Sequence, residues 1–214
     1  MIKAVIFDLD GVIVDSEIAH ALAEKKVLAA YGLVIDEGDW NGFKGKKLNV
    51  MMQEIIDKYR IKDVSLEQLI AEKQKYNSEV IDQSVLFTDF QELIGSIQSD
   101  YAIGLATSST ALFQAAIFDK FNLHSYFRAV VNAEMVSHGK PHPEPYQLAM
   151  RKLGVEPLEV VIIEDAPAGI ESGKAAGAKV VAVTHSLPSS YLRSADYVVD
   201  SLLEVKDILK RLAK

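Results

Sequence analysis

Two carboxylates lie one residue apart near the start of the chain, directly after an apolar run. Asp8 and Asp10 follow the run AVIF and are separated only by Leu9. Side chains at positions i and i+2 of an extended segment point to the same side, so both carboxylates should converge on one small volume. Two unit charges about 4 Å apart repel by roughly 4 kcal/mol at an effective dielectric near 20. The pair therefore predicts a compensating cation.

Further polar side chains follow other apolar runs. Thr107 and Ser108 follow AIGLA, Glu164 and Asp165 follow VVII, and Lys140 lies in the proline-rich segment HGKPHPEPY. Open α/β sheets bind their ligands at the carboxyl ends of the strands, so we expect these residues to share one cleft with the aspartates. Mg²⁺ prefers one or two carboxylates together with waters and phosphate oxygens. The whole set predicts a site for Mg²⁺ and a phosphorylated ligand.

Short apolar runs alternate with helical patterns along most of the chain, and these elements must position the polar residues. Near-continuous apolar strands separated by helices are typical of a parallel sheet that is covered on both faces. We therefore expect a doubly wound α/β core. The predicted strands are residues 4–7, 102–106, 129–131, 160–163, 180–183 and 197–199.

The segment between residues 16 and 82 breaks this alternation, because it shows helical patterns and no convincing strand. Its apolar residues recur with the three- and four-residue spacing of an amphipathic helix. We therefore expect a helical domain over residues 15–82, inserted into a core formed by residues 1–14 and 83–214. The two apolar stripes consist of Leu48, Met51, Met52, Ile55, Ile56 and Tyr59, and of Leu66, Leu69 and Ile70.

Composition limits the classes of function. The 214 residues are 49% hydrophobic and 25% charged, which suits a globular protein with a sizeable core. The net charge of −7 disfavours a nucleic-acid or anionic-membrane partner, and the lack of cysteine excludes disulfides and thiolate metal sites. The opening MIKAVIFDLD reaches an acidic residue too early for a signal-peptide core. We expect a cytoplasmic protein with no evident protein partner.

Each motif taken singly also has a purely structural interpretation. TSST is a common helix N-cap, EDAPAG an acidic helix start, and KPHPEP a polyproline-like loop. DLDG could be a turn, and the acidic positions that an EF-hand would need do not follow it. His138 and His142 lack further nitrogen or sulfur ligands at useful spacing, so the sequence does not favour a transition-metal site there. The functional interpretation depends on the order of the motifs.

That order is distinctive. FDLDG, TSS, GKP and IIEDAPAG, with a helical insertion after the first of them, closely resemble the haloacid dehalogenase-like hydrolase superfamily over essentially the whole chain. The insertion resembles the helical cap of the subfamily that includes β-phosphoglucomutase, phosphoglycolate phosphatase and other small-metabolite phosphatases. The resemblance implies a Rossmann-like core. VLFTDFQEL stands where many relatives carry a proline-glycine turn, a departure that concerns the cap-to-core linker.

The resemblance implies a role for each carboxylate. Asp8 is the expected nucleophile, which forms an aspartyl-phosphate, and Asp10 the expected general acid and then base. Mg²⁺ would bind the Asp8 and Asp165 carboxylates and the Asp10 backbone carbonyl, with Glu164 as an outer or alternative ligand.

The resemblance also assigns the groups around the phosphate. Thr107 and Ser108 are expected to bind phosphate oxygens, and Lys140 to neutralise both the phosphate and Asp8. Phosphoryl transfer depends mainly on positioning and charge neutralisation, so Thr107 and Lys140 count with the catalytic residues.

Substrate contacts are expected from the helical insertion. FKGKKLNVMM matches the lysine-glycine pair of β-phosphoglucomutases at Lys44 and Gly45, but Leu48 stands where those enzymes have an arginine for a second phosphate. GKK, which includes Lys46, resembles a short stretch of pseudouridine-5′-phosphatase-type relatives. His20 matches a position that faces the active site in parts of the family, and a helix-surface histidine is the alternative.

The sequence is compatible with three functions. The first is a Mg²⁺-dependent phosphatase that acts on a small phosphorylated sugar, polyol or nucleotide. The second is a phosphosugar mutase similar to β-phosphoglucomutase. The third is a non-catalytic protein that binds a phosphorylated metabolite, against which Asp8 and Asp10 argue, since binding alone needs neither a nucleophile nor a proton shuttle.

Overall fold

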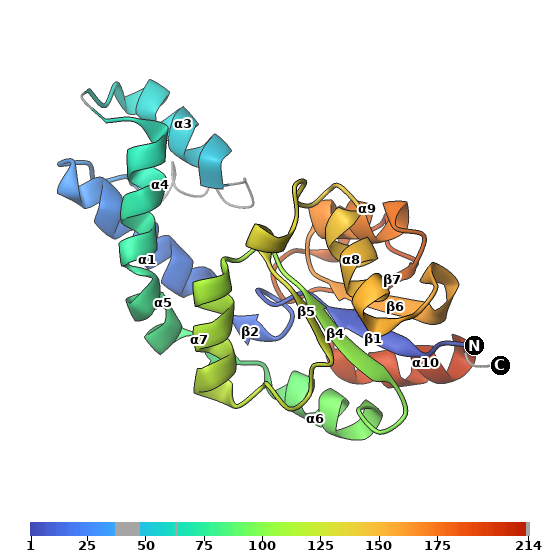
Figure 1. Cartoon of the computed structure of the whole chain (residues 1–214). Helices are drawn as coiled ribbons and strands as arrows, with labels where there is room; N and C mark the ends of the chain where they lie inside the picture. Colours follow the sequence, from blue (N-terminus) through green and yellow to red (C-terminus); the bar gives the residue numbers. More distant parts are fainter. Residues whose placement is uncertain (37–47, 63, 213–214) are drawn as a thin grey trace. The chain divides into compact units, whose positions relative to one another are not determined.

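The structure is a computed structural model of the chain and describes residues 1–36, 48–62 and 64–212 (Figure 1). Contacts divide the chain into two compact units. The core unit comprises Met1–Glu17 and Ser84–Lys214, and the helical unit comprises Ile18–Gln83. The chain leaves the core unit once and returns to it, so the helical unit is an insertion.

A six-stranded sheet of order β5-β4-β1-β6-β7-β8 forms the centre of the core unit, and all its neighbouring strands are parallel. The first strand lies in the middle, and the chain adds strands on one side of it and then on the other. This arrangement confirms the predicted doubly wound α/β fold class. The strands are β1 (Ala4–Phe7), β4 (Ala102–Ala106), β5 (Ala129–Val131), β6 (Val160–Glu164), β7 (Lys179–Val183) and β8 (Tyr197–Val199).

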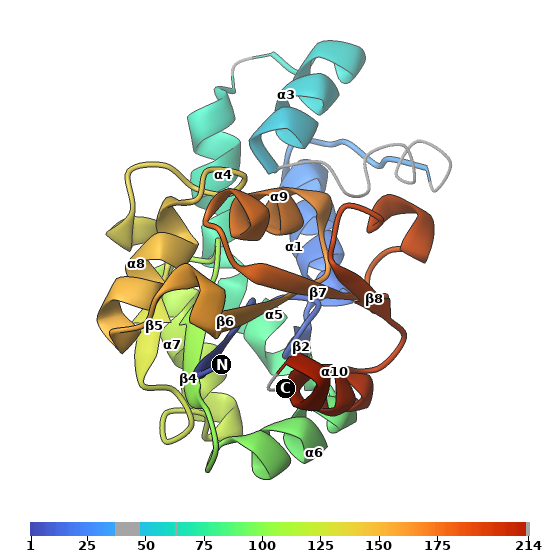
Figure 2. The same ribbon diagram turned by 90° about the vertical axis from the view of Figure 1, so that its right-hand side faces the viewer.

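Helices cover both faces of this sheet, with α8 and α9 on one face and α6 and α10 on the other (Figure 2). Successive side chains of β1 point to opposite faces of the sheet, as the two-residue period of a strand requires. Ile6 packs with Tyr146 of α8, whereas the ring of Phe7 meets that of Phe90 on α6 edge to face at 5.5 Å. The helices are α6 (Thr88–Ile97), α7 (Ala111–Phe121), α8 (Glu144–Leu153), α9 (Pro167–Ala175) and α10 (Val205–Leu212).

A short antiparallel ribbon pairs β2 (Val14–Asp15) with β3 (Val85–Leu86), where the chain leaves and re-enters the core unit. The sequence analysis did not predict it, because two-residue strands are too short to show an alternating pattern. Short 3₁₀ turns complete the unit: η1 (Ala133–Met135), η2 (Pro157–Glu159), η3 (Ser189–Tyr191) and η4 (Leu202–Glu204).

The described part of the helical unit contains α1 (Glu17–Ala30), α3 (Leu48–Tyr59), α4 (Leu66–Lys75) and α5 (Asn77–Gln83). The predicted apolar stripes face its interior, where Met52, Ile55 and Leu69 are fully buried. Ser65 starts α4 with a capping box, in which its hydroxyl accepts a hydrogen bond from the Gln68 N–H and the Gln68 side chain accepts one from the Ser65 N–H. Among the described helices, none has the length and hydropathy to cross a lipid bilayer.

Candidate active site

Three carboxylates meet at the carboxyl ends of the two central strands. Asp8 follows β1 and its N–H donates to the Ile163 carbonyl at 3.0 Å, while Glu164 ends β6 and Asp165 follows it. All three side chains are buried, and each offers an oxygen within 4.8 Å of the others. Parallel register between β1 and β6 thus brings together residues that are more than 150 positions apart in the sequence.

Lys140 supplies the positive charge within this group. Its Nζ donates to Asp8 Oδ1 at 2.5 Å and to Glu164 Oε1 at 2.6 Å, and its side chain is 6% exposed. The ammonium also lies 4.8 Å from the centre of the Tyr146 ring, a favourable cation–π distance. Burial alone would lower the pKa of Lys140, but the Asp8 and Glu164 carboxylates raise it above its ordinary value. The lysine is therefore charged and joins the two strands.

Four hydrogen bonds fix the Glu164 carboxylate. Oε1 accepts from Lys140 and from the Tyr146 hydroxyl at 2.7 Å, and Oε2 accepts from the backbone N–H groups of Asp165 at 3.0 Å and Ala166 at 3.3 Å. Gly169 on α9 lies so close that a Cβ there would overlap the carboxylate. With these partners Glu164 is better suited to an outer role than to direct coordination.

Asp10 has a different environment from Asp8, although only one residue separates them. Its Oδ1 accepts from the Ser16 hydroxyl, and its Oδ2 accepts from the Ser109 hydroxyl at 2.7 Å. The turn that follows needs Gly11, whose φ is +78° and where a Cβ would overlap the Asp165 carboxylate. Asp8 is thus bound by an ammonium and Asp10 by hydroxyl groups.

The hydroxyl residues after β4 lie at the same edge of the sheet. Thr107 is buried, its N–H donates to the Val131 carbonyl at 3.0 Å, and its Oγ1 accepts from the Ser109 N–H at 3.0 Å. Ser108 is exposed. The structure therefore holds the Thr107 hydroxyl in place and leaves Ser108 accessible to a ligand.

The charge balance of the buried group fits a divalent cation. Burial raises the pKa of Asp8 well above its ordinary value, and Lys140 opposes this effect. Burial and then the Glu164 charge raise the pKa of Asp165 to about 7, while a hydrogen bond from Ser186 lowers it. Three buried carboxylates face one ammonium, and an ion with oxygen ligands such as Mg²⁺ would offset the excess negative charge.

Comparisons with known proteins show the family of this chain. The sequence profile described as "Haloacid dehalogenase-like hydrolase" matches residues 5–183, which is most of the chain. The chain belongs to the haloacid dehalogenase-like hydrolase family. This membership confirms the predicted superfamily and the predicted core fold.

Several curated relatives of this hydrolase are named as phosphatases. Fructose-1-phosphate phosphatase YqaB of Escherichia coli is 32% identical over 178 residues, which cover 83% of this chain and 94% of the relative. A phosphorylated carbohydrates phosphatase of Thermotoga maritima is 32% identical over 190 residues, or 86% of this chain and 87% of the relative. The prediction of an enzyme, a phosphatase of this family, is confirmed.

Solved structures of the family have the same overall fold. The crystal structure of β-phosphoglucomutase from Clostridium difficile is 28% identical, covers 100% of this chain and 98% of its own, and superposes with a TM-score of 0.82. The fold of the haloacid dehalogenase-like hydrolase thus extends to the helical unit as well as the core.

The candidate substrate residues of the hydrolase lie in the helical unit. His20 on α1 accepts a hydrogen bond at Nδ1 from Lys73 Nζ at 3.0 Å, and Glu24 lies 3.9 Å from the same ammonium. Burial raises the pKa of Glu24, and Lys73 opposes this effect. His20 is therefore part of a half-buried polar cluster within the unit. The predicted substrate residues Lys44, Gly45 and Lys46 lie outside the described residues.

Sequence reasoning missed several residues of the site. Tyr146 and Gly169 hold Glu164, and Ser16 and Ser109 hold Asp10. Ser109 and Gly169 lie within motifs that the sequence analysis had already singled out, TSST and EDAPAG. Tyr146 ends HGKPHPEPY, another segment that the sequence analysis had singled out, but an aromatic residue early in an amphipathic helix is typical of a core position, so its contact with Glu164 was not predicted.

Proposed function

We propose that the chain hydrolyses a small phosphorylated sugar or polyol in a Mg²⁺-dependent reaction through an aspartyl-phosphate on Asp8. The observation that carries this proposal is the difference in partners between Asp8 and Asp10: an ammonium binds the first, and two hydroxyls bind the second. Burial raises the pKa of Asp8, and the Lys140 ammonium opposes this effect and so favours the ionised carboxylate that a nucleophile must be. Hydroxyl groups can pair with either protonation state, as a proton shuttle requires.

In the first step, a carboxylate oxygen of Asp8 attacks phosphorus. The bond between phosphorus and the leaving oxygen breaks, and Asp10 gives its proton to that oxygen, so that an alcohol departs. Lys140 balances the charge on Asp8 and on the phosphoryl group. Mg²⁺, when bound by the Asp8 and Asp165 carboxylates and the Asp10 backbone carbonyl, would supply further charge neutralisation.

In the second step, water attacks the phosphorus of the aspartyl-phosphate. Asp10, now ionised, takes a proton from this water, and the bond between phosphorus and Asp8 breaks. Inorganic phosphate leaves and both aspartates return to their starting states. We assign Thr107 and Ser108 to the phosphate oxygens that do not change partners, because they lie at the same edge of the sheet as Asp8.

The named relatives support a carbohydrate phosphate as substrate. The two curated phosphatases are named for fructose 1-phosphate and for phosphorylated carbohydrates. We propose that the helical unit is the cap of this enzyme and that His20, Lys44, Gly45 and Lys46 contact the substrate beyond its phosphate. A cytoplasmic location is part of the same proposal, since small phosphorylated metabolites are its expected substrates.

A mutase is the alternative, because the β-phosphoglucomutase of Clostridium difficile is 28% identical. Leu48 counts against it. This residue stands where the mutases have an arginine for a second phosphate, and it packs against the apolar cluster of the helical unit. A leucine cannot bind a phosphate dianion, so we favour hydrolysis.

A panel of sugar and polyol monophosphates tests this proposal through the release of inorganic phosphate. We expect release from at least one member with Mg²⁺, no release in excess chelator, and recovery when Mg²⁺ is restored. Conversion of a hexose 1-phosphate to its isomer without phosphate release would favour the mutase. Full activity in excess chelator would contradict the proposed use of Mg²⁺, and no reaction with any member would favour a binding protein.

A further inference from the structure

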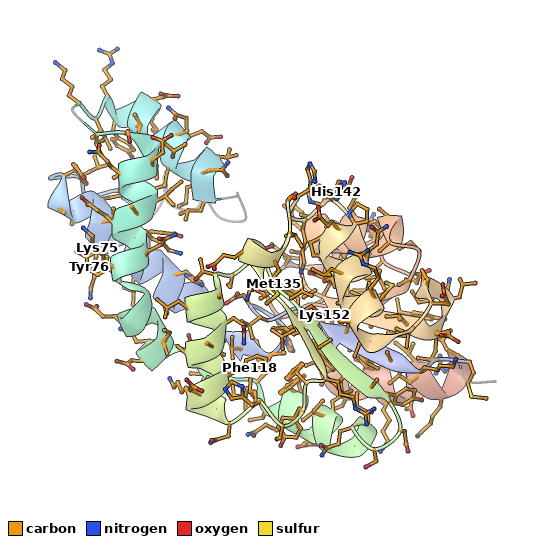
Figure 3. All side chains as sticks on the ribbon, in the orientation of Figure 1. Lys75, Tyr76, Phe118, Met135, His142 and Lys152 are labelled. Atoms are coloured by element: carbon orange, nitrogen blue, oxygen red, sulfur yellow. The ribbon has the colours of Figure 1, made fainter. Side chains whose placement is uncertain are left out.

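The loop that carries Lys140 also presents two imidazoles and a carboxylate on its outer side. His138, His142 and Glu144 each offer one ligand atom, and these atoms all lie within 4.8 Å of one another. Both histidine side chains are well exposed, at 67% and 49%, and Figure 3 shows His142 on the loop before α8, directed away from the sheet. None of the three side chains is used in the proposed phosphatase reaction.

The two imidazoles face one carboxylate oxygen. His138 Nδ1 lies 3.1 Å and His142 Nδ1 lies 4.0 Å from Glu144 Oε2. The rings are 4.6 Å apart between centres and inclined by 33°. His142 Nδ1 accepts a hydrogen bond from the Glu144 N–H at 3.2 Å, so this nitrogen carries a lone pair rather than a proton. Neutral imidazole is the form that binds metals, and an ion bound at Nδ1 would replace the Glu144 N–H as the partner of this lone pair.

The carboxylate is held in place by the loop itself. Glu144 Oε1 accepts from the Ser137 N–H at 2.9 Å, and Oε2 accepts from the His138 N–H at 3.0 Å. The hydrogen bond from Ser137 does most to lower the pKa of Glu144, and the one from His138 lowers it further. An ionised carboxylate of fixed orientation therefore lies beside both imidazoles before any ion binds, which reduces the ordering that binding requires.

We propose that His138, His142 and Glu144 form a binding site for a divalent transition-metal ion of the Zn²⁺ class, separate from the Mg²⁺ site. Two imidazole nitrogens and one carboxylate are a ligand set that Zn²⁺ uses, with water in the fourth position. Mg²⁺ prefers oxygen ligands and does not compete well for this set. Ligand atoms of a tetrahedral site with bonds of about 2.0–2.1 Å lie about 3.3 Å apart, and the ligand atoms of these exposed side chains already lie within 4.8 Å of one another.

The structure, rather than the sequence, brings this set together. From spacing alone His138 and His142 lacked a third ligand, because a glutamate two residues later in a proline-rich segment has no defined direction. The first turn of α8 provides that direction. Since His138 and His142 stand two residues before and after Lys140, a bound ion would join both ends of the loop that positions the active-site lysine.

Zinc titration of the full chain in excess Mg²⁺ tests the proposal, with a chromophoric zinc chelator as competitor. Excess Mg²⁺ competes with Zn²⁺ for the oxygen site. We expect one Zn²⁺ per chain, and His138→Ala and His142→Ala should each weaken its binding at least about tenfold. His124→Ala is the matched control, because His124 is also exposed and also paired with a carboxylate, Asp119, at 2.8 Å. It should bind zinc as the wild type does.

Co²⁺ offers a direct view of the ligands, since its visible absorption reports imidazole coordination. We expect that absorption with the wild type and with His124→Ala, and its loss with the double variant His138→Ala/His142→Ala. Unchanged zinc affinity in the double variant, or no saturable zinc binding by the wild type, would overturn the proposal. Melting temperatures without metal show whether the variants remain folded, as expected for exposed side chains.

Discussion

The proposed chemistry depends on the different partners of two aspartates, Asp8 and Asp10. Asp8 and Asp10 both follow the central strand, and their side chains were expected to share one volume. The structure gives Asp8 the Lys140 ammonium and gives Asp10 the hydroxyls of Ser16 and Ser109. Repulsion between the two is therefore offset by separate partners as well as by any bound cation, and the two carboxylates can hold different protonation states.

Replacement of the proposed nucleophile tests this assignment. Asp8→Asn should lower turnover by at least about 10⁴-fold, the scale of loss when other covalent enzymes lose their nucleophile. It should not lower the melting temperature, because it removes one of three buried carboxylates that face a single ammonium. Phosphate release and thermal unfolding provide the two measurements. Turnover within tenfold of wild type, with deamidation excluded by mass spectrometry, would contradict the assignment.

The hydrogen bond from Tyr146 to Glu164 was not predicted from the sequence. Tyr146→Phe keeps the ring but removes the hydroxyl that donates to Glu164 Oε1. Lys140 then remains as a donor to that buried oxygen. We expect a loss of stability of about 1–2 kcal/mol and about a tenfold higher Mg²⁺ concentration for half-maximal activity. Tyr191→Phe, on a tyrosine that is 63% exposed, is the control. Equal effects of the two variants would show that the buried hydroxyl has no special role.

At the scale of elements, the sequence was informative wherever a pattern was long enough. All six core strands were predicted within one residue of their ends, because buried parallel strands are continuous apolar runs. The β2–β3 ribbon was missed, since each of its strands has two residues. The convergence of Asp8, Glu164 and Asp165 was predictable from strand order, whereas the contacts of Ser109 and Gly169 depend on side-chain directions that no spacing rule provides.

The N-terminal part of α9 must approach the end of β6 closely. Gly169→Ala would push the Glu164 carboxylate away from Lys140, since a Cβ there overlaps it. We expect a destabilisation of about 1–3 kcal/mol and at least about a tenfold loss of turnover. Gly95→Ala is the matched control, because this helical glycine of α6 is exposed and its Cβ would meet nothing within 4 Å. That variant should be neutral or up to about 1 kcal/mol more stable. Urea unfolding and phosphate release distinguish these outcomes.

Asp196, in the segment before β8, forms hydrogen bonds with residues of α9 and β7. Its titration should make the stability of the fold depend on pH. Although burial raises the pKa of Asp196, hydrogen bonds from Lys174 at 2.7 Å, Lys179 at 2.9 Å and the Val180 N–H at 2.9 Å lower it to about 2. A depressed pKa stabilises the fold above the unfolded-state value of 3.8, and this contribution is lost as the pH falls through about 2.

Comparison of Asp196→Asn with the wild type by urea unfolding tests this pH dependence. We expect the variant to be about 1–2 kcal/mol less stable at neutral pH, after allowance for the half-exposed lysines. The difference should shrink as the pH falls from about 4 toward 2. Asp207→Asn, on an exposed aspartate paired with Lys210 at 3.1 Å, is the control and should change stability by less than about 0.5 kcal/mol. A constant difference for Asp196→Asn across the acid range would refute the assigned electrostatic origin.

At the scale of the whole molecule, the two units have different kinds of interior. The core unit carries buried charge at its central strands, whereas the described interior of the helical unit is an apolar cluster with the His20, Glu24 and Lys73 group beside it. Chemistry common to all phosphomonoesters can therefore reside in the core, and discrimination among them in the insertion. The position of the insertion in the sequence indicated this division. The identity of the substrate depends on side chains of the insertion, and for these the sequence offers only a short match to relatives at Lys44 and Gly45.

A pair of substrates of different size tests this division of roles. If Lys44 and Lys46 contact the substrate beyond its phosphate, Lys44→Ala and Lys46→Ala should raise KM for the best sugar phosphate about tenfold, the cost of one charge-assisted hydrogen bond. Hydrolysis of p-nitrophenyl phosphate should be unchanged, because this ester lacks the sugar hydroxyls. Lys140→Ala should damage both reactions alike, since its ammonium binds Asp8 directly. Lys75→Ala, on an exposed lysine of α4 (Figure 3), is the control for charge on the helical unit. If the Lys44 and Lys46 variants lost p-nitrophenyl phosphate turnover as severely as the Lys140 variant, the insertion would take part in the chemistry itself and the proposed division would be wrong.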